Sequence, residues 1–413
     1  MSQTEFRRYI LSSEFKQLLQ CYEETVASGE HAYFDTDDLI DIAEYYNIKK
    51  DIDASVGAAE YCLQQSPGEV LALQLLARTC LTEYKDAGQA QAYIDQLGDD
   101  NSAETVLIKA EALLLKDERQ QAFDMLAAEY ARLQEDAQTG GVDAVGYTDD
   151  EEDEEDCQGD VLECFPLDVA MLLCDYDCFG EAERWMGGYS QAPAEMLFEY
   201  WETWGRIYHA TGRLQQAADA LNKAIDDDAY SVVTWIQLCD VQYQMARVDD
   251  ALQSAQYALA LDAGNEDALM YKACCLLEKK QFDEASNVFE KVVSLYPENP
   301  RPHILLGAIA LEKGDAGEVG RQFTAALEKA DYDIMVILDV GQLMFEMGFV
   351  DATYRLFRIL FEACIQEQNE GGRMTLPPNL VEVLAECSRQ LGKQDEYEYY
   401  KSFIPQRDDD MPF

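Results

Sequence analysis

The sequence predicts an all-α fold in which helix pairs stack into a solenoid, and three regularities carry this prediction. Residue types recur every 34 residues from position 198 to about 367. Small residues return at two fixed places in each period, and glycine or proline returns where a helix has to end. A fixed period of this length is typical of a stacked helical array rather than of a globule with one central core.

The small residues occupy the eighth and twentieth positions of each period, when periods are counted from residues 198, 232, 266, 300 and 334. The eighth positions are Gly205, Cys239, Ala273, Gly307 and Gly341. The twentieth positions are Ala217, Ala251, Ala285, Val319 and Thr353. We expect two helices to cross at these positions, because small side chains let the backbones approach closely, while larger residues fill the surrounding space.

Glycine and proline mark the expected helix ends. Gly212, Gly314 and Gly348 fall at the turn within a period, where a left-handed residue can end the first helix. Pro297 follows the second helix of its period and stops it. The spacing therefore predicts two helices per period.

This pattern resembles the tetratricopeptide repeat (TPR) family, whose signature is a series of tryptophan, leucine, glycine, tyrosine, alanine, phenylalanine and proline positions. The best match is carried by Trp201, Trp204, Gly205, Tyr208, Ala217, Leu221 and Ala224. A later repeat adds Ala285, Phe289 and Pro297. The resemblance implies a right-handed superhelical solenoid of helix–turn–helix repeats.

The rest of the chain is expected to extend this array. Residues 1–134 should hold N-terminal capping helices and degenerate repeats, 135–160 an acidic disordered loop, 161–197 a shortened hairpin, 198–367 five repeats, 368–405 a loop and a C-terminal capping hairpin, and 406–413 a tail. The loop prediction rests on the acidic run 149–156, which repels itself and buries nothing. Such a loop is either a solvated linker or a segment that recruits a basic partner or folds over a basic patch.

The formal net charge of −50 is spread over the whole chain, with 81 acidic against 31 basic residues. This surface repels nucleic acid phosphates, so we do not expect the protein to bind nucleic acid. It would steer basic proteins or peptides towards the chain. Solubility alone is an equally good reason for the acidity.

Twelve cysteines lie in a long helical chain, which lacks the context of a small disulfide scaffold. The first 19 residues contain charges and no apolar run of signal-peptide length. No window reaches the roughly 18 apolar residues of a membrane span. Together these features favour a cytoplasmic protein that does not enter a membrane.

No catalytic or cofactor-binding group of residues is expected. His31, His209 and His303 lie far apart in a linear array. A cysteine cluster raises the question of zinc through Cys157, Cys164, Cys174 and Cys178. The gap between its first two members is longer than a zinc pair uses, so we expect no metal site.

In the family, the first helix of each repeat lines a concave groove, and the resemblance implies the same here. The groove residues expected to contact a partner are Ile236, Asp240, Tyr243, Asp267, Met270, Leu277, Glu278, Ile304, Leu311, Leu338, Gln342 and Phe345. They form an apolar floor with acids around it, which suits a protein or peptide segment that carries apolar anchors and Lys or Arg. The alternatives are that these side chains pack between neighbouring first helices, or that the chain's own tail fills the groove.

The expected function is therefore a non-enzymatic scaffold that binds protein segments, with basic partners favoured. A second hypothesis is an acidic assembly chaperone that shields basic clients through its whole surface. Family members that bind the acidic C-termini of heat-shock chaperones use Lys, Asn and Arg to clamp a carboxylate. Here the matching positions hold Glu202, Arg206, Ile236 and Asp240, so that partner is not expected.

Overall fold

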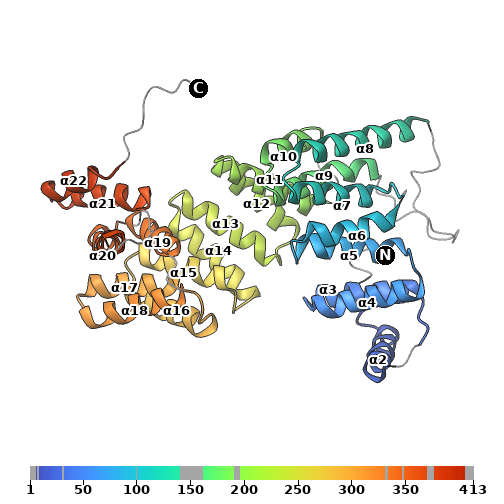
Figure 1. Ribbon diagram of the computed structural model, residues 1–413, viewed down its shortest axis with the longest axis horizontal. Helices are drawn as coiled ribbons and strands as arrows, with labels where there is room; N and C mark the ends of the chain where they lie inside the picture. Colours follow the sequence, from blue (N-terminus) through green and yellow to red (C-terminus); the bar gives the residue numbers. More distant parts are fainter. Residues whose placement is uncertain are drawn as a thin grey trace. The chain divides into compact units, whose positions relative to one another are not determined.

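The computed structural model describes residues 6, 9–29, 32–98, 100–139, 161–189, 196–330, 334–346, 348–369 and 376–404. All regular secondary structure in these residues is helical, which confirms the all-α prediction, and consecutive helices pack as pairs (Figure 1). The chain divides into two compact units, Met1–Arg213 (unit 1) and Leu214–Phe413 (unit 2). Within the described segments, every helix falls short of the length or the apolar character that crossing a bilayer demands.

Unit 1 contains the helices α2 (Ser13–Ser28), α3 (Thr36–Ile48), α4 (Ile52–Gln65), α5 (Val70–Thr82), α6 (Ala87–Leu97), α7 (Ala103–Leu115), α8 (Arg119–Thr139), α9 (Val161–Asp175), α10 (Phe179–Met186) and α11 (Leu197–Ala210). The N-terminal helix α2 packs on α3 because Phe15 and Tyr22 join the buried cluster around Leu39. The ring of Phe15 also contacts the ring of Tyr45 on α3, and a capping role for α2 stays a prediction.

Helix α8 continues past residue 135, where the acidic loop was expected to begin, and ends at Thr139. Its last turns are held by Leu133, which is buried, and by Arg132, which pairs with Glu129 at 2.7 Å and with Asp136 at 2.8 Å. These contacts outweigh the change in composition that suggested the boundary. The acidic run 149–156 and the tail 406–413 lie outside the described residues.

Unit 2 contains α12 (Leu214–Asp227), α13 (Val232–Gln244), α14 (Val248–Leu261), α15 (Glu266–Glu278), α16 (Phe282–Leu295), α17 (Arg301–Lys313), α18 (Ala316–Lys329), α19 (Ile334–Glu346), α20 (Val350–Asn369), α21 (Pro378–Gln390) and α22 (Gln394–Lys401). In this unit α13, α15, α17 and α19 are the first helices of their repeats, and α14, α16, α18 and α20 are the second. The expected C-terminal hairpin corresponds to α21 and α22.

The boundary between the two units falls at the turn between α11 and α12, inside the first of the five expected repeats. The sequence pattern gives no sign of this division. Helix α11 belongs to unit 1 because Tyr200 and Ile207 join a buried cluster with residues of α7, α8, α9 and α10. Each unit therefore has its own hydrophobic core.

In the repeats that begin with α17 and α19, the small eighth residue faces a phenylalanine, which lies four positions beyond the twentieth residue. A Cβ atom added to Gly307 would overlap the ring of Phe323, and one added to Gly341 would overlap the ring of Phe357. In the repeat of α13 and α14 the thiol of Cys239 instead donates to the carbonyl oxygen of Ala251 over 3.1 Å. The predicted close contact between paired helices is present, and a side chain of the second helix fills it.

The turn within each hairpin uses one left-handed residue. Gly212, Gly314 and Gly348 have φ of 73°, 74° and 83°, as the sequence predicts. The equivalent turns after α13 and α15 place Ala246 and Lys280 in the same region, at 56° and 58°. The hairpin geometry is therefore the same in these repeats, although residues with a Cβ atom disfavour the left-handed backbone conformation that the turn requires.

Substituting Gly341 with alanine should lower the stability of unit 2 by about 1–3 kcal/mol, because the ring of Phe357 has to leave its site. Gly320→Ala on α18 is the matched control, since a Cβ there meets no atom within 4 Å. That change should raise stability by about 1 kcal/mol, as alanine favours helix over glycine. Urea unfolding midpoints would compare them, and equal effects of the two substitutions would contradict the packing described.

Candidate functional site

An open cavity of about 500 Å³ lies on unit 2 where α13, α15 and α17 come together. It is lined by Asp240 and Tyr243 of α13, by Glu266, Asp267, Met270, Tyr271 and Cys274 of α15, by Asn299, and by Arg301 and Leu305 of α17. None of these lining residues comes from a second helix. The first helices therefore form the face of unit 2 on which this cavity lies.

The floor of the cavity is apolar and uncharged. Met270 is half-buried, Leu305 is buried, and the rings of Tyr243 and Tyr271 meet edge to face with centroids 6.4 Å apart. Burial raises the pKa of the Cys274 thiol to about 12, so this thiol stays protonated and behaves as a small apolar group. Burial also raises the pKa of both tyrosine hydroxyls, which remain neutral.

Three carboxylates surround this floor. Asp240 accepts hydrogen bonds from the amide of Gln244, which lies 3.2 Å from each carboxylate oxygen. Its charge and a hydrogen bond to it add to burial in raising the pKa of Tyr271. Glu266 accepts a hydrogen bond of 2.5 Å from the amide of Asn299. Both acids are therefore held in place by neutral donors.

The third acid, Asp267, is exposed, and its carboxylate makes no hydrogen bond or ion pair within the described part of the chain. The cavity contains one basic residue, Arg301, which is also exposed and is the first residue of α17. The backbone N–H of Arg301 donates to Asn299 Oδ1 over 2.8 Å. A rim of three acids and one base leaves the cavity with a net negative charge.

Four of the twelve predicted groove residues line this cavity: Asp240, Tyr243, Asp267 and Met270. Three others, Leu277, Ile304 and Leu338, are completely buried, and their side chains belong to the core of unit 2. The remaining five lie away from the cavity lining. Ile236, Leu311, Gln342 and Phe345 are half-buried, and Glu278 is exposed.

The fifth position of the repeat shows why these residues differ. The residues at this position are half-buried in α13 and α15, where they are Ile236 and Met270. They are fully buried in α17 and α19, where they are Ile304 and Leu338. The repeat pattern predicts the same exposure for the fifth residue of every repeat. The observed exposure differs because each first helix has different neighbours along the chain. Sequence reasoning also missed Glu266, Tyr271, Asn299 and Leu305, which occupy frame positions not assigned to the groove.

In unit 1, two arginines on first helices form ion pairs with acids on neighbouring first helices. Arg78 on α5 pairs with Glu104 on α7 at 2.5 Å, and Arg206 on α11 pairs with Asp175 on α9 at 2.6 Å. Arg206 is the one basic residue at the positions where chaperone-binding family members clamp a carboxylate. Here its side chain is already paired with Asp175. The described side chains on these first helices therefore do not form a cluster of unpaired basic residues.

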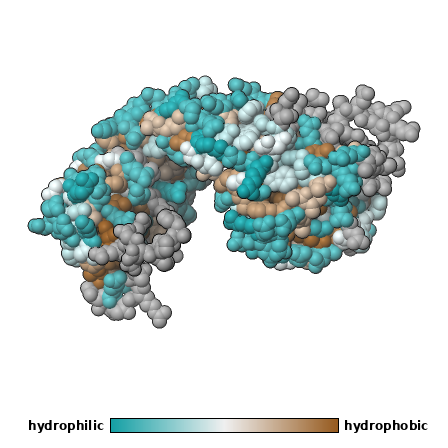
Figure 2. All heavy atoms as spheres, turned by 90° about the horizontal axis from the view of Figure 1, so that it is seen from above, coloured by the Kyte–Doolittle hydropathy of each residue, from teal (hydrophilic) through white to brown (hydrophobic). Residues whose placement is uncertain are grey.

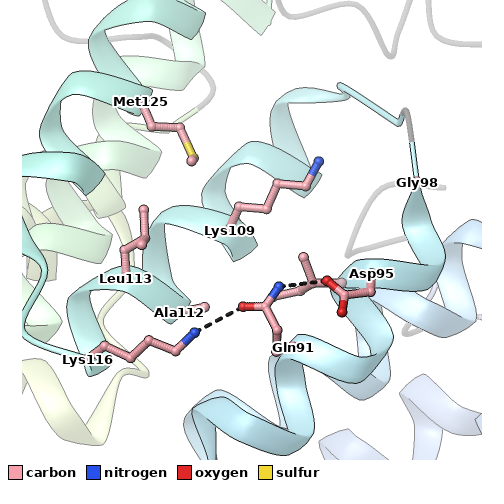
Figure 3. Close-up of a pocket in the computed structure, with 9 residues that line it drawn as sticks. Gln91, Asp95, Gly98, Lys109, Ala112, Leu113, Lys116 and Met125 are labelled. Carbon is pink, nitrogen blue, oxygen red and sulfur yellow. Dashed lines mark hydrogen bonds between the residues drawn. The ribbon is translucent and has the colours of Figure 1, made fainter.

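Unit 1 also has a cavity of about 540 Å³ between α6, α7 and α8, shown in Figure 3. Its polar side chains bond to one another or to the backbone. Lys116 donates to Gln91 over 3.0 Å, Gln91 donates to Asp95 over 2.9 Å, and Lys109 donates to the carbonyl oxygen of Asp100 over 3.0 Å. This network favours a structural role for the groups that line the cavity.

Among the described residues, no three His, Cys, Asp or Glu side chains are grouped to hold a metal ion. In the cysteine cluster weighed for zinc, Cys174 and Cys178 are buried, and Cys178 bonds to the carbonyl oxygen of Tyr176. Cys157 lies outside the described residues. His303 lies 2.7 Å from the side-chain oxygen of Gln322, as expected of a histidine in a packing role.

Sequence profiles of the tetratricopeptide repeat match residues 198–226 and 246–309. These matches confirm the resemblance for the strongest repeats. No curated protein matches the sequence.

Three solved structures match part of this chain. One is titled MamA (22% identity, TM-score 0.38, covering 40% of this chain and 97% of that one). Another is MamA from Desulfovibrio magneticus RS-1 (16%, 0.39, 41% and 96%). The third is YrrB, described as a TPR protein with an unusual peptide-binding site (17%, 0.37, 42% and 89%).

The carboxyl group of Asp168 on α9 lies near the charges of neighbouring first helices in unit 1, and its pKa reports on burial and on those charges. Burial, and then the charge of Glu104, raise its pKa to about 6. Because the folded value lies above the ordinary value near 4, the folded protein binds the extra proton between about pH 4 and 6. The ionised group therefore disfavours folding above pH 6, and this penalty disappears as the pH falls.

Asp168→Asn should stabilise unit 1 at pH 7.5 by about 1 kcal/mol, a value reduced from the full shift because the side chain is partly solvated. The gain should shrink steadily as the pH falls to 5. Urea unfolding at several pH values measures it, with Asp124→Asn on the exposed side of α8 as the control. A gain in unfolding free energy that does not depend on pH would contradict the raised pKa of Asp168.

Proposed function

Since the chain is a tetratricopeptide repeat protein, we propose that it is a non-enzymatic scaffold that binds protein segments at the cavity between α13, α15 and α17. The observation that carries the proposal is an apolar floor surrounded by three carboxylates, all on first helices. Repeats of this family generally serve protein–protein interaction. A segment laid across consecutive first helices would contact several repeats at once.

The preferred partner is a segment that carries apolar side chains and Lys or Arg. Apolar side chains would bury against Met270, Tyr243 and Leu305, and this burial supplies most of the affinity. The carboxylates of Asp240 and Asp267 would attract the basic side chains and raise the association rate. The net charge of −50 extends the same attraction over a longer range at low salt.

The same charges disfavour acidic partners. Nucleic acid phosphates and acidic C-terminal peptides would meet three carboxylates and a single guanidinium at the cavity. Binding these groups normally requires several Lys or Arg side chains that point at the ligand. The proposed specificity therefore includes rejection of acidic segments as well as attraction of basic ones.

We place this activity in a reducing compartment such as the cytoplasm. Eleven cysteines of the described residues are free thiols, and most of them are buried within the cores. Buried cysteine packs as a small apolar residue. Oxidation of these thiols would add polar atoms to the contacts between helices.

The test compares two double substitutions that change the net charge equally. Asp240→Lys with Asp267→Lys reverses two charges at the cavity, and Glu284→Lys with Glu290→Lys reverses two exposed charges on the second helix α16. The probe is a ten-residue peptide of leucine, lysine and serine, titrated at 50 mM and 300 mM salt. The cavity variant should bind at least about tenfold more weakly and lose most of its salt dependence.

The control variant should bind within about twofold of the natural protein at 300 mM salt, where exposed charges farther than a Debye length are screened. Equal losses in both variants would contradict the cavity as the binding site. That outcome would favour the alternative in which the whole acidic surface binds basic clients.

A further inference from the structure

We infer that the bound segment presents its side chains in a fixed chemical order along unit 2: apolar, basic, acidic, apolar. This inference rests on the proposed function and specifies the partner of the same site. It comes from one structurally equivalent position on four consecutive first helices. That position, the second of each period, is occupied in turn by Val233, Asp267, Arg301 and Met335.

All four side chains face solvent. Val233 is 61% exposed and Met335 is 51% exposed, so both apolar side chains can contact a partner. Asp267 and Arg301 are exposed as well, and both line the cavity. The outer members of the series are therefore accessible apolar contacts, and the inner members are accessible charges.

The two charges are available to a ligand. Neither the Asp267 carboxylate nor the Arg301 guanidinium forms a hydrogen bond or an ion pair with any residue that the structure describes. Some other basic residues of unit 2 form ion pairs, since Lys279 pairs with Asp249 and Lys313 pairs with Asp283. An arginine left unpaired in so acidic a chain, inside the candidate site, suits recognition of an acidic group.

The position of Arg301 strengthens this assignment. It is the first residue of the 13-residue helix α17, and its backbone N–H donates to Asn299 Oδ1 over 2.8 Å. A helix N-terminus carries a partial positive charge that favours an anion and disfavours a cation. A partner carboxylate at this point would therefore interact with both the guanidinium and the helix end.

The spacing of the four positions follows from the packing of helices. First helices that pack directly on each other, as α13 does on α15 and α17 does on α19, lie about 10 Å apart. An extended segment advances about 3.3 Å per residue. Successive contacts should therefore come from residues about three apart in the partner. The expected segment is about ten residues long, with apolar ends and with one basic and one acidic residue between them.

This order distinguishes the partner from a uniformly basic segment. A second basic residue at the acidic place would lie against Arg301 and repel it. The three carboxylates would still attract such a segment from a distance, but its fit inside the cavity would be worse. The single arginine therefore selects among the segments that the acidic surface attracts.

The test uses three peptides with leucine at both ends, serine spacers, and two charged residues three positions apart: Lys and Glu, Lys and Lys, or Glu and Glu. Binding to the full chain is measured at 150 mM salt, which screens distant charges. The Lys/Glu peptide should bind at least about tenfold more tightly than either of the others. Because the peptides are compared by composition, the result does not depend on the direction in which they bind.

Arg301→Glu should reverse the preference, so that the Lys/Lys peptide binds more tightly than the Lys/Glu peptide. Lys291→Glu is the matched control on α16, with the same change in net charge at an exposed residue, and it should keep the natural preference. Circular dichroism and urea unfolding would show that both variants remain folded.

Tighter binding of the Lys/Lys peptide by the natural protein would overturn this inference and leave the proposed function standing. Reversal by both variants would also overturn it, because the preference would then follow net charge. If none of the three peptides binds, the inference and the proposed function both fail.

Discussion

The close contact between the two helices of each repeat is the constraint on which the candidate site depends. In the repeats that begin with α17 and α19, a phenylalanine ring from the second helix fills the place where Gly307 or Gly341 has no side chain. The second helix thus occupies one side of the first helix. The remaining side, on α13, α15 and α17, is left to line the cavity, which explains why none of the lining residues comes from a second helix.

Charge then decides what this face can bind. Several basic residues of the first helices in unit 1 and of the hairpin turns in unit 2 form ion pairs, such as Arg206 with Asp175 and Lys279 with Asp249. The acids outnumber the bases, and many remain exposed to solvent. The visible face in Figure 2 is accordingly mostly hydrophilic, with apolar residues in small separate areas. Specific contact therefore depends on places where apolar and charged side chains are exposed together.

Much of the fold follows from the sequence, because a 34-residue period, small residues at fixed positions and left-handed turn residues such as Gly314 are local signals. The site was only partly predictable. Asp240, Tyr243, Asp267 and Met270 could be found from the frame, whereas Leu277 and Ile304 are buried by neighbours that the frame does not describe. Tyr271 and Leu305 also line the cavity, and both occupy the sixth position of their repeats, which the frame does not assign to the groove. The end of α8 and the division at Arg213 depend on tertiary packing, which composition alone does not reveal.

Hydrogen exchange on the full chain tests the central claim, that the first helices of unit 2 are the binding face, most directly. Exchange would be compared with and without a saturating ten-residue peptide that carries leucine, lysine and glutamate. The account predicts slower exchange in α13, α15 and α17, with little change in α14 and α16, because the peptide contacts only the first helices. Protection confined to α14 and α16, or spread evenly over the whole chain, would contradict it.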